Sequence, residues 1–199
     1  MTVEIIDCVQ GEDAWFRARA GVPTASEFSS VLAKGEGKTR ASYMRRLAGE
    51  ILTGEPLESF SNGAMERGKL MEAEARREYE LMTGATCQSV GFVRNGRLGC
   101  SPDSLIGANG ALEIKTMRPD LMIDVLLKDE FPTAHKAQCQ GVLLVCEREW
   151  IDQQVYWKGM PFFVKRAYRD VQYLANLRAE LSRFCEDLDS LVGRIRRMG

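Results

Sequence analysis

Hydrophobic and polar residues follow two periods along this chain, one typical of helices and one typical of strands. Apolar residues three and four apart predict helices, which cover residues 11–20, 24–33, 41–52, 64–82, 119–129 and 133–147. Short runs rich in β-branched and aromatic residues predict strands, which fall at residues 90–94, 98–106, 111–116, 150–157 and 162–168. From Asp170 to about Arg196, one apolar stripe follows a long amphipathic helix.

The predicted elements also indicate the architecture. Helices precede and follow the strands, so we expect an α/β or α+β fold with a central mixed sheet flanked by helices. A length of 199 residues fits a single domain. Its parts are N-terminal helices over 11–82, a hairpin over 97–116 and a C-terminal helix over about 170–196. Thr24, with Glu27 three residues later, has the pattern of a capping box.

The strand over residues 111–116 carries charged residues where a buried strand would carry apolar ones. Side chains alternate between the two faces of a strand, so Leu112 and Ile114 share one face while Glu113 and Lys115 share the other. We expect the apolar pair to face the core and the charged pair to face a cleft or solvent. The second face is therefore available for chemistry.

The loop of this hairpin decides whether Asp103 reaches the charged face. A four-residue loop would turn Asp103 to the opposite face. A three-residue loop over 108–110 places Asp103 opposite Lys115 and diagonal to Glu113, and Gly110 suits the left-handed position that ends such loops. We therefore predict the three-residue loop, with both carboxylates on one face.

The three charged residues of the hairpin match the needs of phosphodiester hydrolysis. Two carboxylates on one face bind hard divalent cations such as Mg²⁺ or Mn²⁺. Such a cation polarises a phosphoryl oxygen and lowers the pKa of bound water. Lys115 would orient that water or offset charge in the transition state. The structural alternative for Glu113 and Lys115 is an ordinary ion pair on an exposed strand face.

Composition narrows the possible chemistry. The chain has a single histidine, His135, which excludes zinc sites built on several histidines. The six cysteines form no CxxC pair and no secretory signal precedes them, so we expect buried reduced thiols. A net charge of −1 does not suit non-specific coating of nucleic acid, although a local basic channel is compatible with it. No apolar run approaches about 18 residues, so we expect a cytosolic protein that spans no membrane.

Four blocks of the sequence occur in an order that resembles one nuclease family. They are AWFRARAGVPTASEF at 14–28, RGKLMEAEAR at 67–76, SPDSL at 101–105 with EIK at 113–115, and AHKAQCQ at 134–140. The third block resembles the PD-(D/E)xK nuclease motif. The whole set is similar to the lambda exonuclease and YqaJ-like viral recombinase family, which has a restriction-endonuclease-like core. The resemblance runs from about residue 10 to about residue 165.

The resemblance implies roles for the matched residues. Asp103, Glu113 and the backbone carbonyl of Ile114 would hold Mg²⁺ or Mn²⁺, with two ions per site. Lys115 would be the catalytic lysine, and Glu72 a further acid near the metals. The residues that would hold the DNA end and its 5′-phosphate are Arg19, Ser26, Ser101, Gln138 and Trp15.

Physical reasoning bears on several of these roles. Ser26 lies in the first turn of a predicted capped helix, where free backbone N–H groups favour an anion, and Arg19 offers donors suited to phosphate. The structural alternatives are helix-start chemistry for Ser26, a surface ion pair for Arg19, a core position for Trp15 and a solvated helix position for Glu72.

The helix over 133–147 carries two glutamines of which one is expected at the site. Gln138 and Gln140 are two residues apart and cannot face the same way on a helix, so we assign Gln138 to the site. His135 precedes Gln138 by one turn, and both a place near the site and simple surface exposure remain open for it.

The resemblance further implies an activity and its partners. Family members are Mg²⁺-dependent 5′ to 3′ exonucleases that digest one strand of linear double-stranded DNA from 5′-phosphorylated ends. They leave 3′ single-stranded tails, form homotrimeric rings, work with a single-strand annealing protein, and act in bacterial cells from phage or prophage genes. Whether the nearby basic residues steer DNA stays open for Lys34, Lys38, Arg40, Arg45 and Arg46.

Two other interpretations remain. The first is another PD-(D/E)xK nuclease, either an endonuclease or a Cas4-like enzyme, although the cysteines lack the clustered spacing of an iron–sulfur site. The second is a catalytically silent module that binds DNA ends. Intact Asp103, Glu113 and Lys115 count against the silent module.

Overall fold

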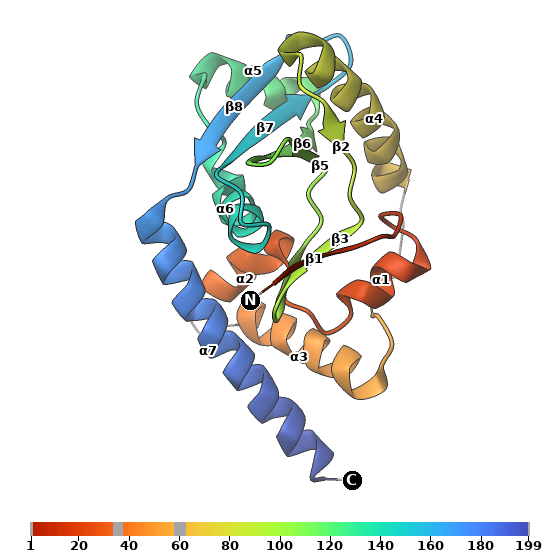
Figure 1. The fold of residues 1–199 in the computed structure, drawn as a ribbon, viewed down its shortest axis with the longest axis vertical. Coiled ribbons are helices and arrows are strands. Elements are labelled where there is room, and N and C mark those ends of the chain that lie inside the picture. Colours follow the sequence, from red (N-terminus) through yellow and green to blue (C-terminus); the bar gives the residue numbers. More distant parts are fainter. Residues whose placement is uncertain (1, 34–37, 58–62, 199) are drawn as a thin grey trace.

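Two β-sheets organise the protein (Figure 1). The computed structural model describes residues 2–33, 38–57 and 63–198, with the backbone alone over 63–69. Within these residues the larger sheet has the strand order β2 (Cys87–Gln88), β5 (Ser104–Ile106), β6 (Gly110–Thr116), β7 (Trp150–Tyr156) and β8 (Phe163–Tyr168). The smaller sheet has the order β1 (Val3–Ile6), β3 (Phe92–Asn95) and β4 (Leu98–Cys100).

The larger sheet is mixed, as the sequence predicts. Strands β6 and β7 are parallel, whereas β5 pairs with β6 and β8 with β7 in antiparallel fashion. A parallel pair needs a long crossover connection. Here it consists of α5 (Pro119–Lys128), the 3₁₀ turn η2 (Thr133–His135) and α6 (Lys136–Val145).

Helices cover both faces of this sheet (Figure 1). Helix α4 (Gly63–Thr83) covers one face, where its Ala75 and Tyr79 pack against Leu112 and Ile114 of β6. Helix α6 covers the other face, and α5 extends that cover through Met122, which packs against Val155 and Phe163. The two faces of β6 therefore lie in two different surroundings.

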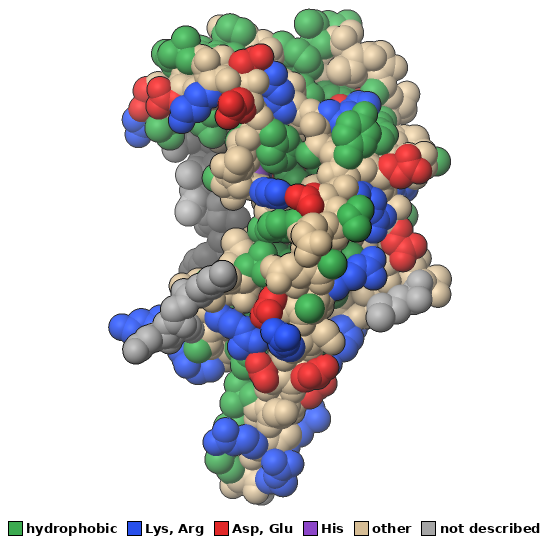
Figure 2. Space-filling view, turned by 90° about the vertical axis from the view of Figure 1, so that its left-hand side faces the viewer, with side chains coloured by type: hydrophobic (Ala, Val, Ile, Leu, Met, Phe, Trp, Pro, Cys, Tyr) green, Lys and Arg blue, Asp and Glu red, His purple; other side chains and the backbone are tan. Residues whose placement is uncertain are grey.

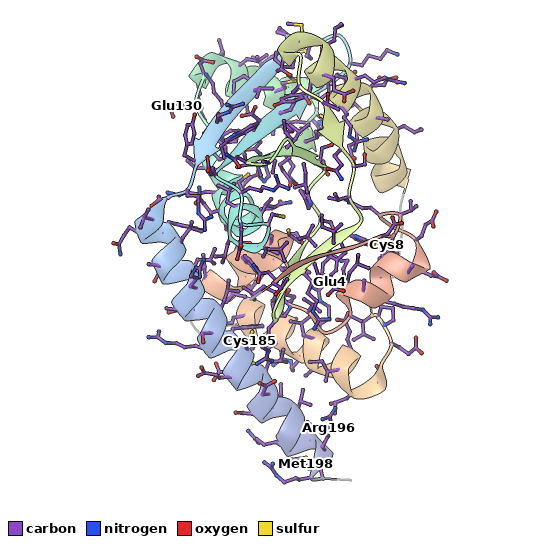
Figure 3. All side chains as sticks on the ribbon, in the orientation of Figure 1. Glu4, Cys8, Glu130, Cys185, Arg196 and Met198 are labelled. Carbon is purple, nitrogen blue, oxygen red and sulfur yellow. The ribbon has the colours of Figure 1, made fainter. Side chains whose placement is uncertain are left out.

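The remaining helices surround the smaller sheet. They are α1 (Asp13–Arg19), the 3₁₀ turn η1 (Ala25–Glu27), α2 (Phe28–Leu32), α3 (Lys38–Thr53) and α7 (Val171–Arg196). The apolar stripe of α7 buries Leu177, Leu181, Phe184 and Leu188 in the main core. The last turns of α7, with Arg196 and Met198, extend beyond the body of the molecule (Figure 3).

Several predicted boundaries need correction. The helix predicted over 24–33 is η1 followed by the five-residue α2, and the Thr24 side chain makes no cap hydrogen bond. Glu27 instead accepts hydrogen bonds from Ser30 and Arg46, so no capping box forms. Strands β1 and β2 have no predicted counterpart, because four and two residues are too few for a period to show.

Two expectations from composition can also be compared with the structure. All six cysteines lie within the described residues and are free thiols, and four of them are buried. Over the part of the chain that is described, none of the helices combines the length and apolarity that a bilayer crossing requires.

Candidate active site

The β5–β6 hairpin has the predicted loop length but a shifted register. Ile106 pairs with Gly110, so the three loop residues are 107–109 and not 108–110. One step beyond the last pair, Ser104 with Leu112, Asp103 lies opposite Glu113 and not opposite Lys115. The expectation of one shared face is correct, and the expected diagonal placement is wrong.

Two glycines explain the shift. Gly107 adopts the left-handed conformation, with φ of +53°, at the first loop position, so Gly110 does not have to supply it. Gly110 belongs to β6, and the ring of Trp150 lies only 2.3 Å from where a Cβ atom on Gly110 would be. Packing against the neighbouring strand therefore places Gly110 inside the sheet.

Glu113 lies on the predicted face but is more buried than a cleft residue would be. Only 3% of its surface is exposed. Its Oε1 atom lies 2.7 Å from Lys115 Nζ and accepts a 2.5 Å hydrogen bond from Gln138 Nε2. Its Oε2 atom is also buried and has no hydrogen-bond partner among the described residues. One carboxylate oxygen is thus held by the protein, and the other is left for a ligand.

Asp103 is held by hydrogen bonds from strand β6 and from helix α4. Its Oδ2 atom accepts a 2.5 Å hydrogen bond from the backbone N–H of Ile114. The backbone carbonyl of Asp103 accepts a 3.1 Å hydrogen bond from Arg76 of α4. Arg76 also donates to Glu72 over 2.5 Å and to Ser104 Oγ over 3.0 Å. Arg76 therefore connects Glu72 to the hairpin.

Arg76 is a site residue that sequence reasoning does not assign. The available signal is its position four residues after Glu72, which is the spacing of a helical ion pair. In a helix rich in arginine and glutamate this signal does not distinguish Arg76 from its neighbours. Only the packing of α4 against the hairpin does so.

Burial raises the pKa of both carboxylates, and charged neighbours modify the two shifts. Burial raises the pKa of Asp103 well above its usual range, and the neighbouring Glu113 and Glu72 carboxylates add to the effect. Burial also raises the pKa of Glu113, although the Lys115 ammonium opposes this. Burial by itself lowers the pKa of Lys115, but the charges of Glu113 and Asp103 and the hydrogen bond to Glu113 together raise it above its usual value. The site therefore concentrates negative charge that a divalent cation would offset.

The donor set fits a hard divalent cation that keeps much of its water. Among the described residues, no group of three His, Cys, Asp or Glu side chains is arranged to enclose a metal ion. Mg²⁺ does not need such a cage, because it is commonly bound through one or two carboxylates and several waters. Asp103 and the unpartnered Oε2 of Glu113 provide the two carboxylates. That the Ile114 carbonyl joins them stays a prediction.

A cleft of about 620 Å³ opens beside Asp103. Glu72, Arg76 and Asp103 line one side, and Trp15 and Phe16 of α1 line another. The segment after β1 completes the wall, and Cys8 in that segment lies beside α1 (Figure 3). A substrate in this cleft would lie against the acidic residues of the site.

Gln10 fixes the wall that follows β1. Its Nε2 atom donates to the backbone carbonyl of Val90 over 2.9 Å and to that of Pro102 over 3.1 Å. Pro102 directly precedes Asp103, so Gln10 braces the hairpin from the N-terminal segment. Sequence reasoning missed Gln10, because the contact joins residues about 90 positions apart.

Three of the residues predicted to hold the DNA end lie together. Trp15 Nε1 donates a 2.8 Å hydrogen bond to Ser101 Oγ, and the Arg19 guanidinium lies over the Trp15 ring at 4.1 Å from its centroid. Trp15 is half-buried, so the prediction of a pure core position does not apply. Because Ser101 Oγ accepts from Trp15, its hydroxyl proton remains for another acceptor.

Ser26 lies in a different setting from that predicted. It is exposed, it lies in the three-residue turn η1, and its Oγ is 3.3 Å from Thr24 Oγ1. The helix-dipole argument for an anion there loses its basis, since no capped helix starts at this point. The turn packs against α6, where a Cβ on Gly141 would lie 3.0 Å from that of Ala25.

Helix α6 separates the two glutamines as expected. Gln138 points to Glu113, whereas Gln140 is buried, donates to the Tyr168 carbonyl over 2.8 Å and accepts from the Asp170 backbone N–H over 2.9 Å. His135 is half-buried, and burial together with the Lys115 charge lowers its pKa. His135 therefore lies within the electrostatic reach of the site.

The basic residues considered for DNA contact have varied surroundings. Lys34 lies outside the described residues. Arg40 forms an ion pair with Asp187 at 2.9 Å, and Arg46 forms one with Glu27 at 3.1 Å. Lys38 and Arg45 are exposed. On the face shown in Figure 2, blue and red side chains are interspersed over the lower part of the molecule.

Comparison with known proteins gives a direct result. The model of the YqaJ-like viral recombinase domain matches residues 14–149. The chain belongs to the YqaJ-like viral recombinase family. A search of curated sequences gives no match.

Solved structures agree with membership of this nuclease family. An alkaline exonuclease from Laribacter hongkongensis, LHK-Exo, is 30% identical with a TM-score of 0.85, and the match covers 94% of this chain and 97% of that one. LHK-Exo in complex with dAMP gives a TM-score of 0.86 with the same identity and coverage. A phage-related exonuclease from Haemophilus somnus 129PT, at 13% identity and a TM-score of 0.66, covers 87% of this chain and 96% of its own and shares the fold.

The family match contains every side chain that the sequence assigned to the site, from Trp15 to Gln138, whereas Gln10 precedes it. It ends before β7, β8 and α7, which the structural match to LHK-Exo largely includes. The elements beyond the family match therefore belong to the same fold, and β7 lies directly beside β6, which carries Glu113 and Lys115.

Proposed function

We propose that this protein is a divalent-cation-dependent exonuclease that digests one strand of linear double-stranded DNA from the 5′ end. The carboxylates of the half-buried Asp103 and the buried Glu113, beside Lys115, are the observation that carries the proposal. Membership of the recombinase family and the likeness to the alkaline exonuclease LHK-Exo support it. The products would be 3′ single-stranded tails.

Each residue of the site has a separate role in this proposal. Asp103 and Glu113 Oε2, joined by the Ile114 carbonyl, would hold one or two Mg²⁺ or Mn²⁺ ions. A bound cation supplies a Lewis acid and lowers the pKa of bound water. Gln138 and Lys115 fix Glu113 through its other oxygen. Glu72, which Arg76 ties to the hairpin, adds negative charge beside Asp103.

Lys115 serves best as a source of positive charge. Its raised pKa keeps the ammonium protonated at neutral pH, so it cannot readily take a proton from water. A protonated lysine stabilises the charge that develops on a phosphoryl oxygen in the transition state. We therefore assign Lys115 to charge stabilisation and to orientation of the attacking water.

The DNA end would lie against the group formed by Arg19, Trp15 and Ser101. Arg19 offers a guanidinium, and Ser101 offers its hydroxyl proton, to a terminal 5′-phosphate. Ser26 and Gln138 are the remaining residues of this proposal.

We extend the proposal to the assembly of the protein. Residues 1–199 would form a single nuclease domain, three copies would form a homotrimeric ring, and a single-strand annealing protein would be the partner. The setting would be the cytoplasm of a bacterial cell, from a phage or prophage gene.

A digestion assay with Mg²⁺ tests the proposal. The substrates are linear duplex with a 5′-phosphate, the same duplex with a 5′-hydroxyl, and covalently closed circular DNA, with each strand labelled separately. We expect loss of the 5′-ended strand, preference for the 5′-phosphate and intact circles. Asp103→Asn should be inactive, whereas Asp120→Asn, which changes an exposed carboxylate paired with Arg118, should match wild type. Cleaved circles or an active Asp103→Asn would overturn the proposal.

A further inference from the structure

A second glutamine, Gln153, lies beside the catalytic carboxylate in the interior of the sheet. The parallel pairing of β6 and β7 sets Gln153 directly opposite Glu113. Residues opposed in this way point to the same face of a sheet and are neighbours across one strand spacing, about 4.8 Å. Gln153 therefore shares the face of Glu113, the one that α6 covers.

The packing of both strands agrees with this assignment. Ala111 and Ile151, one pair before, lie together in the core cluster that includes α6. Val155, one pair after and opposite Lys115, packs against Met122 of α5. Asp152 and Gln154, which flank Gln153, point the other way, since Asp152 accepts a 2.6 Å hydrogen bond from Tyr79 of α4 and Gln154 lies 3.3 Å from Glu78 of α4.

The Gln153 side chain is polar, buried and without a partner. Its exposed fraction is 0%, and neither Nε2 nor Oε1 has a hydrogen-bond partner among the described residues. Lys165, which lies opposite Gln153 on β8, instead forms an ion pair with Asp129 at 2.7 Å. A buried polar group without a hydrogen bond destabilises the folded state, so such groups are seldom kept without a use.

Glu113 offers the matching group. Its Oε2 atom is also buried, and among the described residues it too has no hydrogen-bond partner. Glu113 and Gln153 are paired across β6 and β7, so both unsatisfied groups lie on the same face of the sheet. An amide N–H and a carboxylate oxygen on adjacent residues can meet directly or through one internal water, which is how buried polar groups are usually satisfied. Gln138 of α6 already donates a hydrogen bond of this kind to Glu113 Oε1.

We infer that Gln153 is a positioning residue for Glu113, acting by a hydrogen bond from its carboxamide to Glu113 Oε2, directly or through one internal water. This inference rests on the proposed function, because it concerns the carboxylate that would hold the cation. Glu113 would then be fixed from two sides, by Gln138 through Oε1 and by Gln153 through Oε2. A carboxylate oxygen has two lone pairs, so Oε2 can accept this bond and still bind a cation.

Direct measurement of Mn²⁺ binding tests the inference without using catalysis. Groups that orient metal ligands typically change metal affinity about 10-fold to 100-fold when removed. We expect Gln153→Met, which keeps the side-chain length, to raise the Mn²⁺ dissociation constant about 10-fold. The metal-free variant should still unfold in one cooperative transition, with a melting temperature a little below wild type, because Glu113 Oε2 loses a hydrogen bond while the amide is replaced by an apolar group.

Gln154 provides a matched control in the next position. It is equally buried and lies on the same strand, but it faces α4, where its Nε2 atom is 3.3 Å from Glu78. Gln154→Met should change the Mn²⁺ dissociation constant by less than about twofold, since its side chain lies on the opposite face of the sheet from the Glu113 carboxylate. Asp103→Asn defines the signal that remains when the site itself is lost.

The outcomes separate this inference from the proposed function. If wild type binds Mn²⁺ through Asp103 and digests linear duplex, but Gln153→Met binds Mn²⁺ as wild type does, the inference alone is overturned. If wild type neither binds Mn²⁺ nor digests DNA, both are overturned. If Gln153→Met does not fold, a crystal structure of Mn²⁺-bound wild type decides. A Gln153 carboxamide bonded only to groups other than Glu113 would then reject the inference.

Discussion

Gln138 Nε2 donates a 2.5 Å hydrogen bond to Glu113 Oε1 and so joins helix α6 to strand β6 across 25 positions of sequence. The same oxygen lies 2.7 Å from Lys115 Nζ. Two donors on one oxygen fix the rotation of the carboxylate about its axis. The orientation of Glu113 Oε2, the atom available to a cation, therefore depends on a residue outside the hairpin.

Substitution of the two glutamines of α6 should affect different properties: Gln138 should affect metal affinity, and Gln140 should affect stability. Gln138→Leu removes a donor to the metal-binding carboxylate and should raise the Mn²⁺ dissociation constant about 10-fold, with a small change in melting temperature. Gln140→Leu removes two buried hydrogen bonds, which join α6 to Tyr168 and Asp170, and should lower the free energy of unfolding by about 1–3 kcal/mol. Titration calorimetry and urea unfolding measure the two effects, and equal losses of Mn²⁺ affinity in both variants would contradict the assignment.

The metal-free protein should lose stability as pH rises above the ordinary carboxyl range. Folding raises the pKa of Asp103 and of Glu113, so above about pH 4 the unfolded chain releases protons that the folded protein still holds. The stability penalty grows until the pH passes the raised pKa values. Metal-free Asp103→Asn, which cannot ionise at this position, should therefore melt above wild type at pH 8 and close to it at pH 4.

Thermal melting in the presence of a chelator measures this difference. Addition of Mg²⁺ should then raise the melting temperature of wild type at pH 8 and leave Asp103→Asn unchanged, because only the wild-type carboxylates bind the cation. A metal-free Asp103→Asn that melts below wild type at pH 8 would show that the Asp103 carboxylate is stabilising without a cation.

Loss of Lys115 should affect catalysis far more than loss of another lysine on the same face. Lys115→Met removes the ammonium beside Glu113 and should lower the rate of DNA digestion at saturating Mg²⁺ about 100-fold or more. Lys165→Met, on β8 of the same sheet, breaks only an ion pair with the exposed Asp129 and should stay within about twofold. Initial rates on 5′-phosphorylated duplex give the comparison, and similar rates for the two variants would remove Lys115 from the mechanism.

The α4 face of the sheet contains a network whose role is structural. Asp152 is 3% exposed, forms an ion pair with Arg166 at 2.7 Å and accepts a 2.6 Å hydrogen bond from Tyr79. Arg166→Met leaves a buried carboxylate without its cation and should lower the free energy of unfolding by about 3 kcal/mol. Arg118→Met, at an exposed pair with Asp120, should cost about 0.5 kcal/mol or less. Urea unfolding distinguishes them, and DNA digestion by folded Arg166→Met should be unchanged.

Much of the hairpin could be predicted from the sequence. The alternation of Leu112, Glu113, Ile114 and Lys115 assigns the two faces, because a period of two is a property of any strand. An odd loop length follows from the need to bring Asp103 to the face of Glu113. The exact register does not follow, since it depends on Trp150, which lies about 40 residues later and packs against Gly110.

Among the residues around the two carboxylates, some could be predicted from the sequence and others could not. Gln138 is identified by family resemblance and by its separation from Gln140 on a helix. Arg76, Gln10 and Gln153 have no such signal, because each reaches the site through a contact between distant elements. The predicted capping box at Thr24 fails for a related reason. A local hydrogen bond from Ser30 and a tertiary ion pair with Arg46 occupy Glu27, which the pattern assigns to the helix start.

The sequence by itself determined the face of each residue along β6, the odd loop, the buried stripe of α7 and the family. Those features depend on neighbours within a few residues, where covalent geometry fixes the period. Only the tertiary structure decided that Asp103 lies opposite Glu113, that Oε1 of Glu113 is held while Oε2 is not, and that Gln153 lies beside it. These relationships depend on how the hairpin packs against strands and helices far from it in the chain, and local periodicity carries no information about that packing.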